Sequence, residues 1–97
     1  MERHGFVARL KPEFREQYIE AHNNISPELV SRYRRAGVHR ILLFLFDEAL
    51  FMYMEVENWK AAQAALGQDP LDIEWQKLVS PMKDPDFREM HEIFRME

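Results

Sequence analysis

Two apolar runs, residues 38–46 and 50–57, constrain the fold of this chain more than any other feature. Both runs favour β-structure, and only residues 47–49 separate them, so the segment predicts an antiparallel β-hairpin. One face of such a hairpin is usually polar where it lies against water. Here neither face is polar, and both faces of the sheet therefore need to be covered.

The side chains of the hairpin divide between its two faces by simple alternation. In the first run, Leu42, Phe44 and Phe46 point to one face, and Ile41, Leu43 and Leu45 point to the other. In the second run, Leu50, Met52, Met54 and Val56 point to one face, and Phe51 and Tyr53 point to the other. Helices of the same chain can cover one face. We expect a second copy of the sheet, related by a two-fold axis, to cover the other in a homodimer. The alternative is a monomer in which residues 80–87 cover the second face.

Further helices and strands are predicted from capping residues, prolines and glycines. They are a strand over residues 4–10, helices over residues 12–22, 27–36, 58–66 and 70–79, an irregular connection over residues 80–87, and a closing strand over residues 90–96. Ser26 followed by Pro27, for example, forms an N-cap and N1 pair, and Gly37 stands where that helix ends. The order β-α-β-β-α-β with extra short helices predicts a ferredoxin-like α+β fold in one domain, residues 1–97.

Composition and charge exclude several classes of function. A chain of 97 residues holds one hydrophobic core, and 46% hydrophobic with 31% charged residues of mixed sign indicates a folded, soluble domain. The net charge of -4 gives no reason to expect a nucleic-acid or membrane partner. The absence of cysteine excludes a disulfide scaffold, a thiolate metal site and a cysteine nucleophile. No apolar run is long enough to span a membrane, and the first ten residues do not resemble a signal peptide, so we expect a cytoplasmic protein.

The remaining residues favour acid–base chemistry. The sequence has no glycine-rich phosphate loop, no metal-binding histidine pair and no nucleophile-elbow motif. Tyr18 and His22 lie four residues apart on one helix, so a phenol and a group that titrates near pH ~6.5 share one stripe. Such a pair can move protons without a cofactor. In the alternative interpretation, Tyr18 is a core residue and His22 is a surface or C-cap histidine.

Three other residues are candidates for contact with a ligand. Trp75 offers an aromatic plane of the kind that packs on the apolar face of a sugar, although tryptophan in a helical stripe also serves as core. We expect Glu74 on the inward face of the same helix, where it either lies at a solvated rim or holds a polar ligand. His39 is expected on the Ile41 face of its strand, facing either a pocket or the dimer interface.

Several short motifs occur in a recognisable order in the first part of the chain. They are Arg3, Phe6-Val7, Pro12, Tyr18, His22-Asn23, Ile25, Pro27-Glu28-Leu29 and Gly37-x-His39. In this order the chain resembles the L-rhamnose mutarotase family, most strongly over residues 3–39 and more weakly over almost all of the rest. The resemblance implies a dimeric ferredoxin-like protein with an α/β-barrel type of assembly. It also implies an enzyme that interconverts the α and β anomers of a 6-deoxy-L-hexopyranose without metal or cofactor.

The resemblance also implies roles for single residues. The family histidine that matches His22 is regarded as the proton donor, and the tyrosine that matches Tyr18 contacts the sugar. Two positions depart from the family pattern: Ile41 stands where the family has a sugar-contacting tyrosine, and Glu74 precedes Trp75 where the family has two tryptophans. An unmatched buried polar group costs roughly 1–3 kcal/mol, so these departures change which sugar hydroxyls can be paired.

We therefore expect an aldose 1-epimerase that acts on L-rhamnose or on a related sugar such as L-fucose. His22 is the expected general acid and base, and Tyr18 and Trp75 are the expected substrate-binding residues, with no metal and no cofactor. Glu74 is a candidate for a second proton-handling group. The rival predictions are a cofactor-independent monooxygenase on the same dimeric fold and a module that only binds a ligand or a partner.

Overall fold

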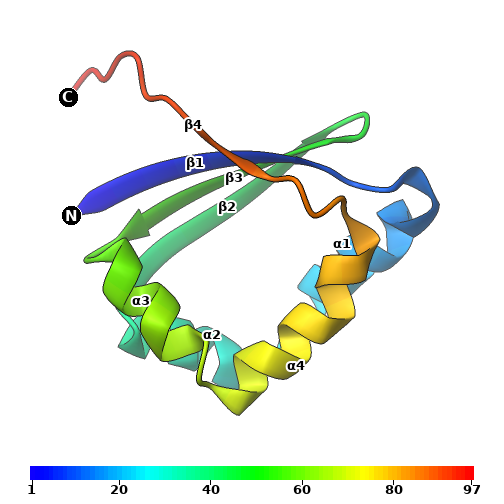
Figure 1. Cartoon of the computed structure of the whole chain (residues 1–97), viewed down its shortest axis with the longest axis horizontal. Coiled ribbons are helices and arrows are strands. Elements are labelled where there is room, and N and C mark those ends of the chain that lie inside the picture. Colours follow the sequence, from blue (N-terminus) through cyan, green and yellow to red (C-terminus); the bar gives the residue numbers. More distant parts are fainter.

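The centre of the structure is an antiparallel sheet of four strands in the order β2-β3-β1-β4, seen in a computed structural model that describes all 97 residues (Figure 1). The strands are β1 (Glu2–Arg9), β2 (Val38–Phe46), β3 (Ala49–Val56) and β4 (Arg88–Met90). The predicted hairpin is confirmed, because β2 and β3 pair up to Phe46 opposite Ala49. Asp47 in the turn has φ 53°, a left-handed conformation that aspartate tolerates better than most residues.

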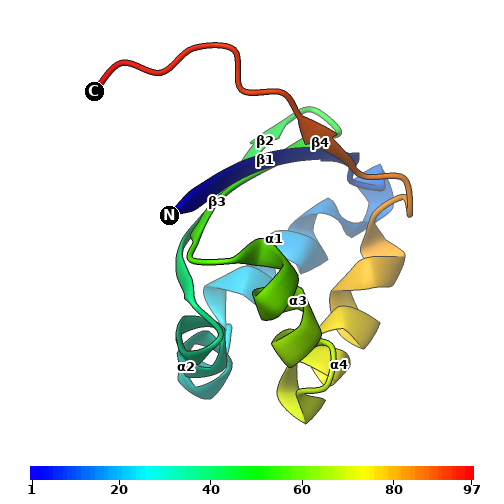
Figure 2. The ribbon, with the colours of Figure 1, turned by 60° about the vertical axis from the view of Figure 1, so that its left-hand side comes forward.

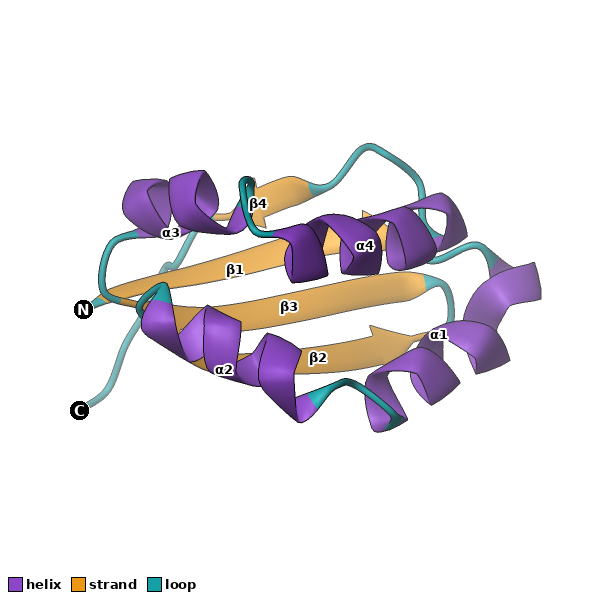
Figure 3. Cartoon of the chain, turned by 90° about the horizontal axis from the view of Figure 1, so that it is seen from below, coloured by secondary structure: helices purple, strands orange, loops and turns teal.

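Four helices lie on one side of the curved sheet (Figures 2 and 3). They are α1 (Arg15–Asn23), which follows a 3-10 turn at Pro12–Phe14, α2 (Pro27–Arg35), α3 (Trp59–Leu66) and α4 (Pro70–Val79), which a second 3-10 turn at Ser80–Met82 extends. Ser26 caps α2 by accepting hydrogen bonds from the backbone N–H groups of Glu28 and Leu29, as the sequence predicts. Gly37, with φ +96°, follows the C-terminal end of α2. None of the helices has the length and apolar character needed to cross a membrane.

The side of the sheet that the helices cover, called the inner face here, holds the hydrophobic core. The core forms two clusters of buried side chains, one of Leu10, Tyr18, Leu50, Val79 and Met82, and one of Val38, Met54, Val56, Ala62 and Leu66. Each cluster joins sheet residues to residues of at least one helix. The helices are thus fixed at both ends of the inner face.

The opposite side of the sheet, the outer face, leaves the apolar side chains of β2 exposed in the single chain. Leu42, Phe44 and Phe46 are 41%, 60% and 73% exposed, so the predicted alternation of β2 is confirmed. The alternative in which residues 80–87 cover this face is wrong. Phe87 instead packs against Phe6 on the inner side, with ring centroids 5.5 Å apart.

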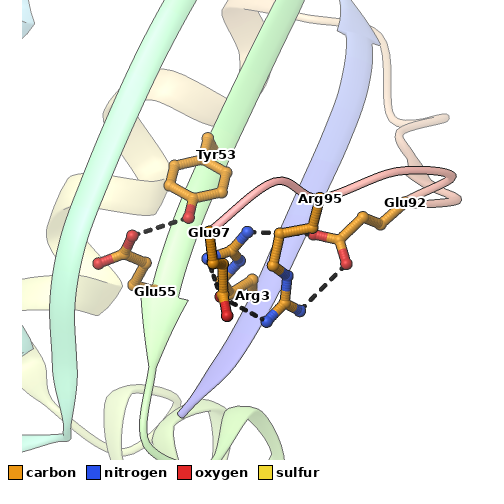
Figure 4. A network of polar contacts seen from close by, with 6 residues as sticks. All are labelled: Arg3, Tyr53, Glu55, Glu92, Arg95 and Glu97. Carbon is orange, nitrogen blue, oxygen red and sulfur yellow. Dashed lines mark hydrogen bonds and ion pairs between the residues drawn. The ribbon is translucent and has the colours of Figure 1, made fainter.

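The end of the chain departs from the sequence prediction, because the expected strand over residues 90–96 does not form. β4 ends at Met90, and residues 91–97 have no regular structure. Arg3 holds this tail through Glu92 at 3.4 Å and Glu97 at 3.8 Å, and Arg95 also pairs with Glu92 (Figure 4). The apolar residues at positions 93, 94 and 96 that suggested a strand are 79–88% exposed, because β4 finds only a short stretch of β1, Gly5–Val7, to pair with.

Candidate active site

A cavity of about 780 Å³ lies between the inner face of the sheet and the helices. Its walls are mostly hydrophobic, with a small number of polar side chains among them. This size and composition are typical of sites that bind small molecules. The cavity is therefore the candidate active site, and it receives side chains from the strands, from the helices and from the connection after α4.

His22 enters this cavity from α1, one turn after Tyr18. Its Nδ1 lies 2.8 Å from the backbone carbonyl oxygen of Tyr18. A carbonyl oxygen only accepts hydrogen bonds, so Nδ1 carries the proton, and Nε2 of the neutral ring keeps a free lone pair. The imidazole is thus fixed in orientation and in tautomer by the helix that carries it.

The surroundings of His22 favour its neutral form. Burial lowers the pKa of His22 below its ordinary value of 6.5, although the hydrogen bond to the Tyr18 carbonyl acts in the opposite direction. The positive charge of Lys83 lowers the pKa further. At neutral pH the ring is therefore uncharged and able to accept a proton at Nε2.

Tyr18 belongs to the hydrophobic core and also lines the cavity, so its position is compatible with the core interpretation and with contact to a ligand. Its side chain is 5% exposed and its ring centroid lies 4.4 Å from that of His22. Burial raises the pKa of Tyr18 to about 12, so the phenol stays protonated. Its hydroxyl has no hydrogen-bond partner within the protein, which leaves it free to bind a ligand in the cavity.

Trp75 of α4 completes this group on the other side of the imidazole. Its ring meets His22 edge to face, with centroids 4.9 Å apart and an interplanar angle of 82°. The fold thus brings together the three site residues predicted from the sequence, with His22 between the two aromatic rings. Ile41, one of the two departures from the family pattern, also lines the cavity.

The predicted inward position of Glu74 is wrong. Its side chain is 74% exposed and pairs with Lys77 at 3.5 Å, away from the cavity. Successive helical residues are rotated by about 100°, so the neighbour of an inward residue need not face inward itself. The cavity side of α4 carries Asp72, Trp75, Gln76 and Val79 instead.

His39 lies at the border of the cavity, but its ring bonds to a carboxylate of the protein surface. A β-bulge interrupts the pairing between Val38 and Arg40, which places His39 at the irregular end of β2. Its Nε2 lies 2.6 Å from a carboxylate oxygen of Glu57, and both side chains are exposed. His39 therefore borders the cavity with its ring bonded to a surface carboxylate.

A polar cluster on the cavity wall was missed in the sequence. The hydroxyl of Tyr33 in α2 donates to Oδ1 of Asp72, a carboxylate that is only 7% exposed, and Nε2 of Gln76 lies 3.4 Å from the same oxygen. Burial and the bond to Asp72 raise the pKa of Tyr33. The spacing of Asp72, Gln76 and Val79 is that of one helical stripe, and this stripe was the signal that could have revealed the cluster.

Three other cavity residues also went unnoticed in the sequence. Trp59 at the start of α3 packs against Phe6 with ring centroids 5.8 Å apart, and it widens the aromatic part of the wall. Lys83 and Phe87 reach the cavity from the connection between α4 and β4, with Lys83 Nζ 5.9 Å from the centre of the Phe87 ring. No local pattern marks a residue of an irregular connection as part of a site.

A ferredoxin-like sheet that encloses a hydrophobic cavity, with a neutral imidazole and a free phenol on its wall, defines an α+β protein of the class that binds and transforms small molecules. A model of the L-rhamnose mutarotase family matches residues 3–96. The chain therefore belongs to the L-rhamnose mutarotase family.

Individual relatives agree with this membership. The L-rhamnose mutarotase of Oceanobacillus iheyensis is 29% identical over 105 aligned residues that cover the whole of both chains. The crystal structure of L-rhamnose mutarotase FA22100 from Formosa agariphila superposes with a TM-score of 0.83 over all of both chains, at 22% identity. A monooxygenase of Streptomyces coelicolor, solved with nanaomycin D, shares the fold with a TM-score of 0.67 at 14% identity, over 98% of this chain and 89% of the other. The predicted ferredoxin-like fold is confirmed, and this fold is common to both classes of enzyme.

Proposed function

We propose that the protein is an aldose 1-epimerase that interconverts the α and β anomers of a 6-deoxy-L-hexose, with L-rhamnose as the first substrate and L-fucose as the alternative. One observation carries this proposal: in a chain of the L-rhamnose mutarotase family, the neutral imidazole of His22 lines a small-molecule cavity with its Nε2 free. Mutarotation requires a group of this kind. Opening the sugar ring removes a proton from the anomeric hydroxyl and delivers one to the ring oxygen.

His22 suits the first of these transfers. With Nδ1–H bonded to the Tyr18 carbonyl, Nε2 accepts the proton of the anomeric hydroxyl as the bond between C1 and the ring oxygen breaks. The open aldehyde then rotates about its C1–C2 bond. On reclosure at the opposite face, the imidazolium returns its proton to the new anomeric oxygen, which is the donor role that the family resemblance implies. A well-placed group of this kind contributes about 10²–10⁴-fold in rate.

The other predicted site residues suit the binding of a sugar. The Tyr18 hydroxyl is free to bond to a sugar hydroxyl beside the imidazole, and Trp75 offers an aromatic plane to the apolar face of the ring. Ile41 and its apolar neighbours in the cavity are compatible with the methyl group of a 6-deoxy sugar. Gln76 and Asp72, rather than Glu74, are the α4 residues within reach of further hydroxyls.

Saturation-transfer NMR of anomer exchange tests the proposed function directly. We expect the wild-type protein to accelerate exchange for L-rhamnose or L-fucose above the rate in buffer, and more than for D-glucose, which lacks the apolar methyl group. Oxygen uptake with an aromatic substrate would instead support the monooxygenase. A protein that accelerates exchange for none of several deoxy and ordinary aldoses would contradict the proposal.

We also propose that the protein assembles as a homodimer through the outer face of its sheet. The exposed side chains of Leu42, Phe44 and Phe46 support this assembly, since contiguous exposed apolar surface of this kind marks an interface. Packing against a second copy would cover the same surface on both subunits. A cytoplasmic location stays a prediction from the sequence.

A further inference from the structure

The backbone around Lys83 is fixed as firmly as a strand, although it belongs to the connection between α4 and β4. Lys83 forms an antiparallel bridge with Leu10, just after β1. On either side, the N–H of Lys11 donates to the Met82 carbonyl at 2.9 Å and the N–H of Asp84 donates to the Arg9 carbonyl at 2.9 Å. The position of the lysine is therefore determined by the sheet.

The side chain of Lys83 carries a positive charge into the cavity without a counter-ion. The side chain is half-buried and lines the cavity together with His22, and no carboxylate lies within ion-pair distance of its ammonium group. The adjacent carboxylate, Asp84, pairs with Arg9 at 3.4 Å instead. The ammonium lies over the ring of Phe87, with Nζ 5.9 Å from the ring centroid. An ammonium in this position can offer its protons to a ligand.

His22 and Lys83 line the same cavity in different protonation states, because the imidazole is neutral and the ammonium is charged. Burial lowers the pKa of Lys83 from its ordinary 10.5, which makes the ammonium a better acid while it stays charged at neutral pH. Its charge also lowers the pKa of His22. The other titratable residues that line the cavity are Tyr18 of α1, Tyr33 and Arg34 of α2, His39 and Arg40 of β2, and Asp72 of α4. The cavity thus contains a neutral base and a charged acid that interact.

We propose that Lys83 is the second proton-transfer residue of the site, and that its Nζ donates a proton to the ring oxygen of the sugar while Nε2 of His22 accepts the proton of the anomeric hydroxyl. This inference rests on the proposed function and deepens it. As the bond between C1 and the ring oxygen breaks, C1 and the anomeric oxygen form the aldehyde, the ring oxygen becomes a hydroxyl, and the two residues become an amine and an imidazolium. Reclosure reverses both transfers, so the protein returns to its starting state without a cofactor.

Three lysine variants test this role by anomer-exchange NMR at saturating and subsaturating sugar. Lys83→Gln should lower kcat by about 10²–10⁴-fold with a smaller change in KM, because a general acid acts mainly in the transition state. Lys83→Arg should lose most of the same activity, since a guanidinium keeps its charge but does not release its proton. Lys77→Gln is the matched control, because this lysine is 70% exposed and outside the cavity, and it should keep the wild-type rate.

A measurement that needs no activity accompanies the kinetics. Removing the charge in Lys83→Gln should raise the pKa of His22 in an NMR titration, whereas Lys83→Arg and Lys77→Gln should leave it nearly unchanged. Thermal unfolding of each variant checks that the fold is intact.

The outcomes separate the two proposals. If the wild-type protein exchanges anomers and Lys83→Gln is equally active, the role of Lys83 is overturned and the proposed function stands. If Lys83→Arg is fully active, proton donation by Lys83 is overturned, because the positive charge alone is then sufficient. A wild-type protein that exchanges no anomers would overturn the proposed function, and the role of Lys83 with it.

Discussion

The two faces of one sheet have the same apolar character in the sequence and opposite environments in the structure. On the inner face, Ile41, Leu43 and Leu45 are half-buried beneath the helices and lie beside the cavity or its core. On the outer face, Phe44 and Phe46 of the same strand are mostly exposed. The same alternation of β2 thus supplies an apolar cavity wall on one side and an exposed apolar surface on the other.

The polar groups of the two faces differ as clearly as the apolar ones. On the inner side, the Tyr33 hydroxyl donates to a buried carboxylate, and burial changes the pKa values of Tyr18 and His22. On the outer side, the Tyr53 hydroxyl donates to Glu55 at 2.7 Å, and this carboxylate is more exposed than Asp72 (Figure 4). Desolvation makes a hydrogen bond or a charge worth more, so chemistry is concentrated on the inner side.

His22→Ala should have the largest effect. Removing the imidazole should lower anomer exchange by about 10²–10⁴-fold, the usual contribution of general acid–base catalysis. Sedimentation should show an unchanged oligomeric state, because His22 lies on the inner side. Glu74→Gln is the control on a neighbouring but outward carboxylate, and we expect it to keep the wild-type rate. Exchange that survives in His22→Ala would remove this residue from the mechanism.

Helix starts and the Tyr18–His22 pair could be predicted from the sequence because they depend on local geometry. Ser26, Asn58 and Asp69 each cap a helix through hydrogen bonds to N–H groups two or three residues away. Tyr18 and His22 are brought together by one turn of α1.

Other parts of the site depend on contacts between distant segments. The backbone of Lys83 is placed beside the cavity by its bridge to Leu10, and the buried carboxylate of Asp72 accepts a hydrogen bond from Tyr33 of another helix. The inward side of α4 was also misassigned by about one residue, which placed Glu74 inside. The strand expected at residues 90–96 failed for a related reason, since its apolar side chains find no partner within one chain.

Phe44→Glu should have the next largest effect, and it concerns the outer face only. In the proposed dimer it places like charges from both subunits in an apolar interface, which costs several kcal/mol and weakens association by roughly 10²-fold or more. Sedimentation velocity across a range of concentrations should show dissociation to monomers.

A matched control for Phe44→Glu comes from α4. Ile73 is also an exposed apolar residue, at 40%, but it lies outside the sheet, so Ile73→Glu should leave the association state unchanged. A wild-type protein that is monomeric at all concentrations would contradict the proposed dimer, and a Phe44→Glu dimer as tight as the wild type would show that another surface forms it.

A pair of tyrosine variants compares the two faces more finely. Tyr33→Phe removes a donor from the buried carboxylate of Asp72 and leaves only the longer contact with Gln76, so it should lower the free energy of unfolding by about 1–3 kcal/mol. Tyr53→Phe removes a hydrogen bond to Glu55, a carboxylate that is more exposed than Asp72, and should therefore change the stability less. Urea denaturation measures both. Equal losses would show that burial does not separate the two faces.

The smallest expected effect is the difference between two histidine titrations. Burial lowers the pKa of His22 in the folded protein. The neutral His22 side chain therefore contributes fully to the free energy of unfolding above pH 6.5, and this contribution is lost as the pH falls through the lowered pKa. For His4, burial also favours the neutral form, but hydrogen bonds from its two ring nitrogens to Glu2 and Glu89, each 2.9 Å long, raise the pKa. Its contribution is present below pH 6.5 and is lost as the pH rises through the raised value. NMR titration should therefore place His22 below 6.5 and His4 above it, and the reverse order would mean that the His22 imidazole is exposed to solvent rather than enclosed in the cavity.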